Sequence, residues 1–176
     1  MRYKMVFKIK NEQKYTLSFG IFMMLIVSAT YCFAQEKPST SVDHYKTNRF
    51  DIAIFPPAKA FLISRPLFTP SREEVNKAET ALDRQLKELN SKLFNQVTTP
   101  IIHKHLKKYK RQYFGYIDEN NDRILFINCF WGKEIMHEKE WLKQRIMVND
   151  GGSYYWSIKY NIKTDKLFEL YVNGEG

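Results

Sequence analysis

The sequence has very few cysteines, and those it has cannot cross-link a fold. Only Cys32 and Cys129 occur among 176 residues, and Cys32 lies in an N-terminal segment that we expect to be removed. A single remaining thiol cannot form an internal disulfide, so packing and hydrogen bonds must stabilise the domain. Cys129 sits within the apolar stretch F-I-N-C-F, which predicts a buried and unreactive thiol.

Motifs for nucleotide, metal or catalytic chemistry are also lacking. Asp150-Gly151-Gly152 has neither the following helix nor the lysine of a phosphate loop, which favours a turn. No cysteine or carboxylate follows His103 and His105 at ligand spacing, and lysines surround them, so we interpret both as surface residues. We therefore predict no catalytic residue, no metal site and no cofactor.

Acidic residues are fewer than basic ones, 19 against 28, and the formal net charge is +9. Residues 1–34 hold five bases and one acid, so their removal takes away +4 and leaves +5 on 142 residues. So modest a charge does not call for nucleic acid as a partner; it suits anionic cell-surface material, or solubility alone. A basic run could form an anionic site or a lysine-protected edge strand. The run consists of Lys104, Lys107, Lys108, Lys110 and Arg111.

The N-terminus has the three parts of a secretory signal peptide. Basic residues come first, an apolar run covers Leu17 to Val27, and smaller residues lead to Ala34. We predict that residues 1–34 are a signal peptide cleaved near Ala34-Gln35, and that the protein is exported to the periplasm or secreted. Contact with a membrane is then expected only through this segment.

Two other interpretations of the N-terminus stay open. An uncleaved anchor would need roughly 20 apolar residues, and Ser18 and Gly20 interrupt a shorter run here. A lipidated Cys32 would need a small residue before it, and Tyr31 is bulky.

Residues 35–49 are polar and predict a flexible arm, and residues 50–176 predict a single α+β domain. Residues 50–55 and 60–64 are short apolar stretches close to prolines. Proline lacks an amide donor, so these stretches favour edge or loop structure over a central strand.

Residues 71–96 predict one long amphipathic helix. Ser71 and Glu74 form a capping box at its start. Apolar residues then recur at steps of three and four and define a single stripe. The stripe consists of Val75, Ala78, Leu82, Leu86, Leu89 and Leu93.

A period of two in the C-terminal half predicts five strands, near 108–117, 123–131, 143–149, 153–161 and 166–173. Short polar turns between them favour antiparallel pairing. The expected fold is α+β, with the helix packed on an antiparallel meander of four to five strands.

Apolar matching predicts the register of the last strands. A three-residue loop with Gly152 in the left-handed conformation would place Ile146 opposite Trp156. The other expected pairs are Trp156 with Val172, Ile158 with Leu170, and Tyr160 with Phe168.

Four residues within the aromatic strands are our candidates for a ligand site. Rings stack on ligands while planar polar groups orient them, so we single out Arg111, Tyr113, Asn128 and Trp131. The alternative is an aromatic core in which Arg111 and Asn128 satisfy each other. Gly115 is expected at a bulge or a close contact.

The order Y-K-R-Q-Y-F-G-Y-I-D, I-L-F-I-N-C-F-W, D-G-G-S-Y-Y-W and V-N-G-E resembles small exported proteins of Bacteroidetes-type bacteria, over about residues 69–175. The resemblance implies export, but it implies no activity and no site residue.

These observations favour a non-enzymatic binding module whose partner is a protein, a peptide or an anionic glycan. An inhibitor or immunity-type protein acting on one enzyme is a second hypothesis. A small enzyme with a pocket near Arg111 and Asn128 is a third.

Overall fold

The computed structural model describes residues 40–60, 64–132 and 139–175. All of them fall within one compact unit, Pro38–Gly176. The predicted signal peptide lies outside these ranges. Within them, no helix is long and apolar enough to span a bilayer.

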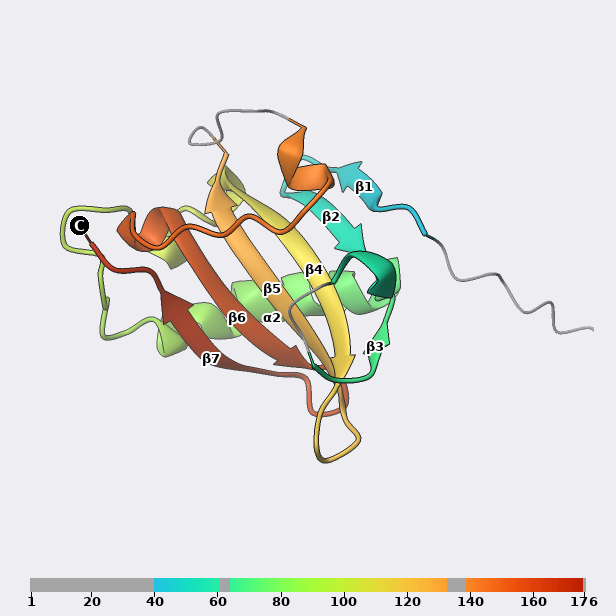
Figure 1. Cartoon of the computed structure of the whole chain (residues 1–176). Coiled ribbons are helices and arrows are strands. Elements are labelled where there is room, and N and C mark those ends of the chain that lie inside the picture. The colour runs from blue at the N-terminus through green and yellow to red at the C-terminus, as the bar shows by residue number, and fades with distance from the viewer. Residues whose placement is uncertain (1–39, 61–63, 133–138, 176) are drawn as a thin grey trace, which may run out of the picture. The chain divides into compact units, whose positions relative to one another are not determined.

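Over the described residues the unit is α+β, as predicted, with one α-helix on a sheet of seven strands (Figure 1). The prediction of four to five strands was too low. The strands are β1 (Asp43–Lys46), β2 (Asp51–Phe55), β3 (Leu67–Phe68), β4 (Tyr109–Ile117), β5 (Arg123–Trp131), β6 (Tyr155–Asn161) and β7 (Lys166–Val172). Short 3-10 turns are η1 (Pro57–Lys59), η2 (Ile102–Lys104), η3 (Leu106–Lys108), η4 (Glu140–Leu142) and η5 (Gly152–Tyr154).

The sheet order is β1-β2-β4-β5-β6-β7, with β3 paired to β4. All pairs are antiparallel except β2 with β4, which are parallel because the helix connects them. Residues 51–55 thus form an interior strand between β1 and β4, and the expectation of edge or loop structure was wrong. Pro56 follows the strand and removes none of its ladder bonds. The expected arm also contains β1, and residues 61–63 of the apolar stretch 60–64 lie outside the described ranges.

The helix α2 (Arg72–Leu89) begins at the predicted capping box, in which Ser71 and Glu74 bond each other's backbone amides. It ends at Asn90, well before the predicted residue 96. The Asn90 side chain turns back and forms two buried hydrogen bonds with Gln96. Leu89 and Leu93 are consequently exposed.

The helix-side core matches the predicted stripe and strand alternation. Val75, Ala78, Leu82 and Leu86 of α2 are buried against the sheet. Trp156, Ile158 and Tyr160 of β6 face them, as expected.

The opposite face of the sheet has its own smaller core. Phe55, Phe114, Phe130 and Trp141 are buried there. Residues 139–150 cross this face in front of the sheet (Figure 1). We call residues 139–150 the crossing segment.

The predicted strand 143–149 does not exist. The crossing segment is irregular, and β6 pairs directly with β5, with Trp156 opposite Cys129. Ile146 packs in the core away from α2, whereas Trp156 lies in the helix-side core, so their predicted pairing was wrong. Gly151 and Gly152 do have positive φ angles, but they lead into η5 and not into a hairpin.

Of the three predicted pairs between β6 and β7, one is present, and Tyr160 pairs with Leu167 and not with Phe168. Trp156 pairs with Val172 as predicted, but a bulge then shifts Phe168 opposite Lys159. Glu169 has a φ of 49° at this bulge. The shift turns Leu167 into the helix-side core, while Phe168 contributes to the other face.

Gly115 lies at a close contact, as predicted. A Cβ atom there would come within 2.7 Å of the Phe68 carbonyl oxygen and ring. Both atoms belong to the paired strand β3, which cannot withdraw without losing its bonds to β4.

We expect Gly115→Ala to lower the free energy of unfolding by about 1–3 kcal/mol through overpacking, measured by urea denaturation. Gly174→Ala is the matched control, because its nearest neighbour is an Asp150 oxygen at 4.0 Å. Equal stability of the two variants would contradict the close contact.

Candidate ligand-binding site

The structure places two of the predicted site residues under the helix. Arg111 is 1% exposed, and its Nε lies 3.1 Å from Glu79 Oε1 of α2. The Tyr113 hydroxyl donates to the same oxygen at 2.6 Å. Burial and the neighbouring Glu79 carboxylate raise the pKa of Tyr113 well above its usual value. These groups form a buried polar cluster between α2 and the sheet.

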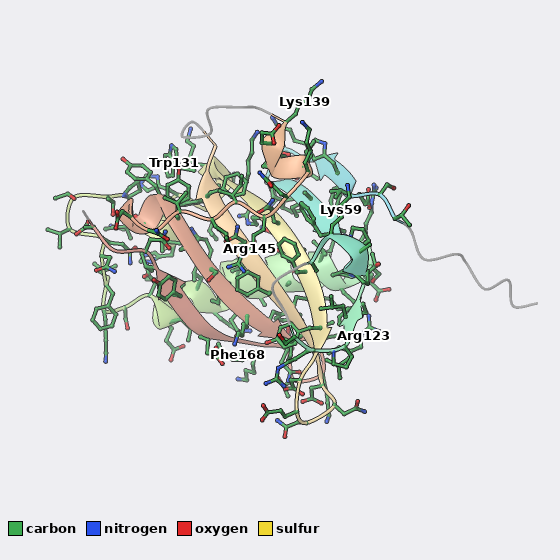
Figure 2. All side chains as sticks on the ribbon, viewed as in Figure 1. Lys59, Arg123, Trp131, Lys139, Arg145 and Phe168 are labelled. Carbon is green, nitrogen blue, oxygen red and sulfur yellow. The ribbon has the colours of Figure 1, made fainter. Side chains whose placement is uncertain are left out.

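Trp131 lies at the end of β5, half-buried, at the margin of the helix-side core. Its ring meets the rings of Tyr109 and Tyr154 edge to face, with centroid separations of 5.1 and 5.6 Å. It is remote from Arg145, which lies over the middle of the opposite face (Figure 2).

Asn128 faces the other way. It is directly opposite Gln112 in the β4–β5 ladder, and its Nδ2 donates to Gln112 Oε1 at 2.9 Å. Arg111 and Asn128 therefore do not satisfy each other, and the four predicted residues do not share one surface.

Gln112 and Asn128, which we call the amide pair, bind the backbone of the crossing segment. Gln112 Nε2 donates to the carbonyls of Trp141 and Gln144, both at 2.7 Å. Gln112 Oε1 also accepts from the Ile146 amide at 2.9 Å, and Asn128 donates to the Ile146 carbonyl at 2.8 Å. Gln112 thus uses its full capacity of two donors and two acceptor positions.

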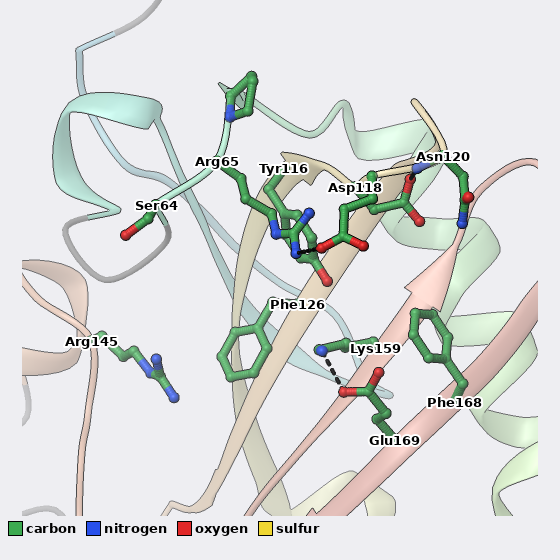
Figure 3. Close-up of a pocket in the computed structure, with 12 residues that line it drawn as sticks. Ser64, Arg65, Tyr116, Asp118, Asn120, Phe126, Arg145, Lys159, Phe168 and Glu169 are labelled. Carbon is green, nitrogen blue, oxygen red and sulfur yellow. Dashed lines mark hydrogen bonds and ion pairs between the residues drawn. The ribbon is translucent and has the colours of Figure 1, made fainter.

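Beside the crossing segment, the same face is hollowed by a cavity of about 840 Å³ (Figure 3). We call it the sheet-face pocket. Its apolar wall consists of Tyr116, Phe126 and Phe168. The complete lining is Ser64, Arg65, Pro66, Tyr116, Asp118, Glu119, Asn120, Phe126, Arg145, Lys159, Phe168 and Glu169.

Two of the three cations at the pocket are already paired. Arg65 Nη2 contacts Glu119 at 2.6 Å, and Lys159 is paired with Glu169 (Figure 3). Lys159 also lies 5.9 Å from the centre of the Phe168 ring.

Arg145 is the exception. Its guanidinium carbon lies 4.4 Å from the centre of the Phe126 ring, and its Nε is buried without a hydrogen-bond partner. No carboxylate among the described residues forms an ion pair with it. Burial lowers the pKa of the Arg145 guanidinium, although an arginine stays charged at any physiological pH.

Sequence reasoning missed this pocket because its walls come from six separate segments. Arg145 was assigned to a strand that does not exist, and Phe168 was assigned to the core. Alternation along β5 does place Phe126 on the face away from α2, and that is the one available signal.

The remaining candidates fit structural or surface roles. Cys129 is buried, as predicted, and burial raises the pKa of its thiol. Lys104, Lys107 and Lys108 are exposed on 3-10 turns, not on an edge strand. Across the described ranges, no group of three or more His, Cys, Asp or Glu side chains could hold a metal ion.

No protein-family model, no curated protein and no solved structure matches this chain. The fold and the pocket therefore define an α+β domain with an open cavity on its sheet. Any function must be inferred from the side chains that line this cavity.

We expect Asn128→Ala to loosen the crossing segment, because it removes the bond to the Ile146 carbonyl and one bond to Gln112. The free energy of unfolding should fall by about 1–3 kcal/mol, and trypsin should cleave faster after Lys143 and Arg145. Asn76→Ala, at an exposed position of α2, is the control. An unchanged cleavage rate at these two sites would show that the amide pair does not hold the segment.

Proposed function

We propose that this protein is an exported, non-enzymatic binding protein that takes its ligand in the sheet-face pocket. The pocket itself carries this proposal. Its volume, about 840 Å³, lies within the range of sites that bind small organic molecules.

The composition of the pocket supports binding rather than chemistry. Aromatic side chains offer flat apolar surfaces, and the charged groups at the rim can orient a ligand. The carboxylates of Glu119 and Glu169 are engaged by Arg65 and Lys159, so neither is poised as a free acid or base.

Export is supported by the signal-peptide pattern of residues 1–34. A fold without disulfides is compatible with either the periplasm or the exterior, because the buried cores and polar clusters supply its stability.

We expect small ring-bearing ligands to shift the NMR signals of Tyr116, Phe126 and Phe168. The probes are N-acetylphenylalanine, its amide, galacturonate and its methyl ester. Phe126→Ala should weaken binding at least tenfold, because it removes an aromatic contact surface worth on the order of 1–3 kcal/mol.

Phe94→Ala is the matched control, since Phe94 is 68% exposed and does not line the pocket. Shifts that fall elsewhere, or no binding of any probe at millimolar concentration, would count against the pocket as the site.

An inhibitor or immunity-type protein is a second candidate, favoured by the loop 91–98. Phe94 and Val97 are 68% and 88% exposed there. The buried Asn90–Gln96 pair braces the loop, and Leu93 and Asn95 hold positive φ angles of 51° and 53°. A rigid loop with protruding apolar side chains loses little entropy on inserting into a partner.

This second candidate predicts capture of one stoichiometric protein from envelope extract. Val97→Ser should abolish the capture, whereas Phe126→Ala should leave it intact. Capture that survives Val97→Ser would exclude the loop as the contact surface.

A further inference from the structure

We propose that the ligand of the sheet-face pocket carries a carboxylate within a few bonds of a ring, and that Arg145 binds the carboxylate while the ring packs against Phe126. This inference rests on the proposed function and specifies the chemical class of the ligand.

The first argument is the unbalanced charge of Arg145. Arg145 is only partly exposed, and its buried Nε has no hydrogen-bond partner among the described residues. A charged donor that loses water in this way is destabilised unless an acceptor compensates for the loss. The Phe126 ring covers one face of the guanidinium, but its π-electrons cannot satisfy the N–H donors at the edge. An anionic ligand would supply the acceptors that the described part of the chain does not.

The second argument concerns the shape and number of charges. A guanidinium presents parallel N–H groups that match the two oxygens of a carboxylate. The pocket is lined by three cations (Arg65, Arg145, Lys159) and by three acidic side chains (Asp118, Glu119, Glu169). Two of these cations are paired with Glu119 and Glu169, and Asp118 accepts the backbone amides of Asn120 and Asp122, so Arg145 is the cation of the lining that has no acidic partner within the described ranges. One added carboxylate is therefore compensated by Arg145, whereas a polyanion such as nucleic acid is disfavoured.

The third argument is the apolar wall. Phe126 lies beside Arg145, and Phe168 lies on the far side of the Lys159–Glu169 pair (Figure 3). A carboxylate at Arg145 therefore places the group attached to it over aromatic surface, where a ring can stack.

The fourth argument is that Arg145 is held in place before any ligand arrives. The amide pair bonds the backbone of Gln144 on one side of it and of Ile146 on the other. Binding then does not have to order this part of the chain, which preserves affinity.

Two sources share this chemistry: a peptide that ends in an aromatic residue, and a uronic-acid sugar. Calorimetry on the purified chain compares N-acetylphenylalanine with its amide, and galacturonate with its methyl ester. In each pair the ring is kept and the charge is removed. The acid should bind about tenfold tighter than its neutral partner in one pair, as expected for a charge-assisted hydrogen bond, and that pair identifies the source.

The variant Arg145→Gln should lose this preference and bind acid and neutral probe equally. Arg145→Lys should retain part of it, because the charge remains without the planar fork. Lys143→Gln is the control, since it removes an exposed positive charge from the same segment and should leave the preference unchanged.

The outcomes separate the two proposals. If no probe binds, the pocket itself is not the site. If acid and neutral probes bind equally to the unaltered chain, or if Arg145→Gln keeps the preference, the pocket binds ligands but the carboxylate inference is wrong. The comparison of acid with neutral probe needs no variant, so it holds even if Arg145→Gln fails to fold.

Discussion

The amide pair of Gln112 and Asn128 is the interaction on which this architecture depends. These two side chains stand opposite each other on β4 and β5 and bond three backbone positions of the crossing segment: Trp141, Gln144 and Ile146. Apart from the 3-10 turn η4, the crossing segment has no helix or strand ladder to satisfy its amides and carbonyls, and buried backbone groups must be satisfied. The amide pair supplies those partners, so an irregular chain can close one half of the sheet and leave the other half open as a pocket.

A second polar cluster serves the other face. Glu79 of α2 pairs with Arg111 and accepts a hydrogen bond from Tyr113, inside an otherwise apolar core. Buried charges of this kind add little net stability over apolar packing, but removing one partner is costly. Such a cluster therefore specifies how α2 lies on the sheet more than how strongly it binds. Polar groups at the centre of each face fix the position of what covers it.

The sequence predicted what local rules govern and missed what depends on long-range contacts. The capping box at Ser71 and the stripe from Val75 to Leu86 follow from helical periodicity, and both are correct. The parallel pairing of β2 with β4 depends on a crossover, and the bulge at Glu169 reverses the face of Phe168; neither leaves a periodic signal. Residues 143–149 contain Ile146 and Val148 two positions apart, as one face of a strand would, but β5 is paired with β4 on one side and β6 on the other. The sequence singled out Arg111 and Asn128 as polar residues in apolar strands, and both make polar contacts within the fold. Arg111 pairs with Glu79, and Asn128 bonds Gln112 and the crossing segment. Sequence could not say that they face opposite ways, because that depends on the phase of the alternation in two paired strands.

The same logic explains why Arg145 is distinctive. The other buried polar side chains discussed here have partners within the fold, and those partners account for their presence: Glu79 for Arg111, Gln96 for Asn90, and the crossing segment for the amide pair. Arg145 has an aromatic ring beneath it and no carboxylate partner among the described residues, yet its backbone is fixed on both sides. A charge that only needed solvent could have stayed on an exposed side chain such as Lys143. A carboxylate site requires a cation that is held in place at the edge of a cavity and whose N–H donors have no acceptor in the protein.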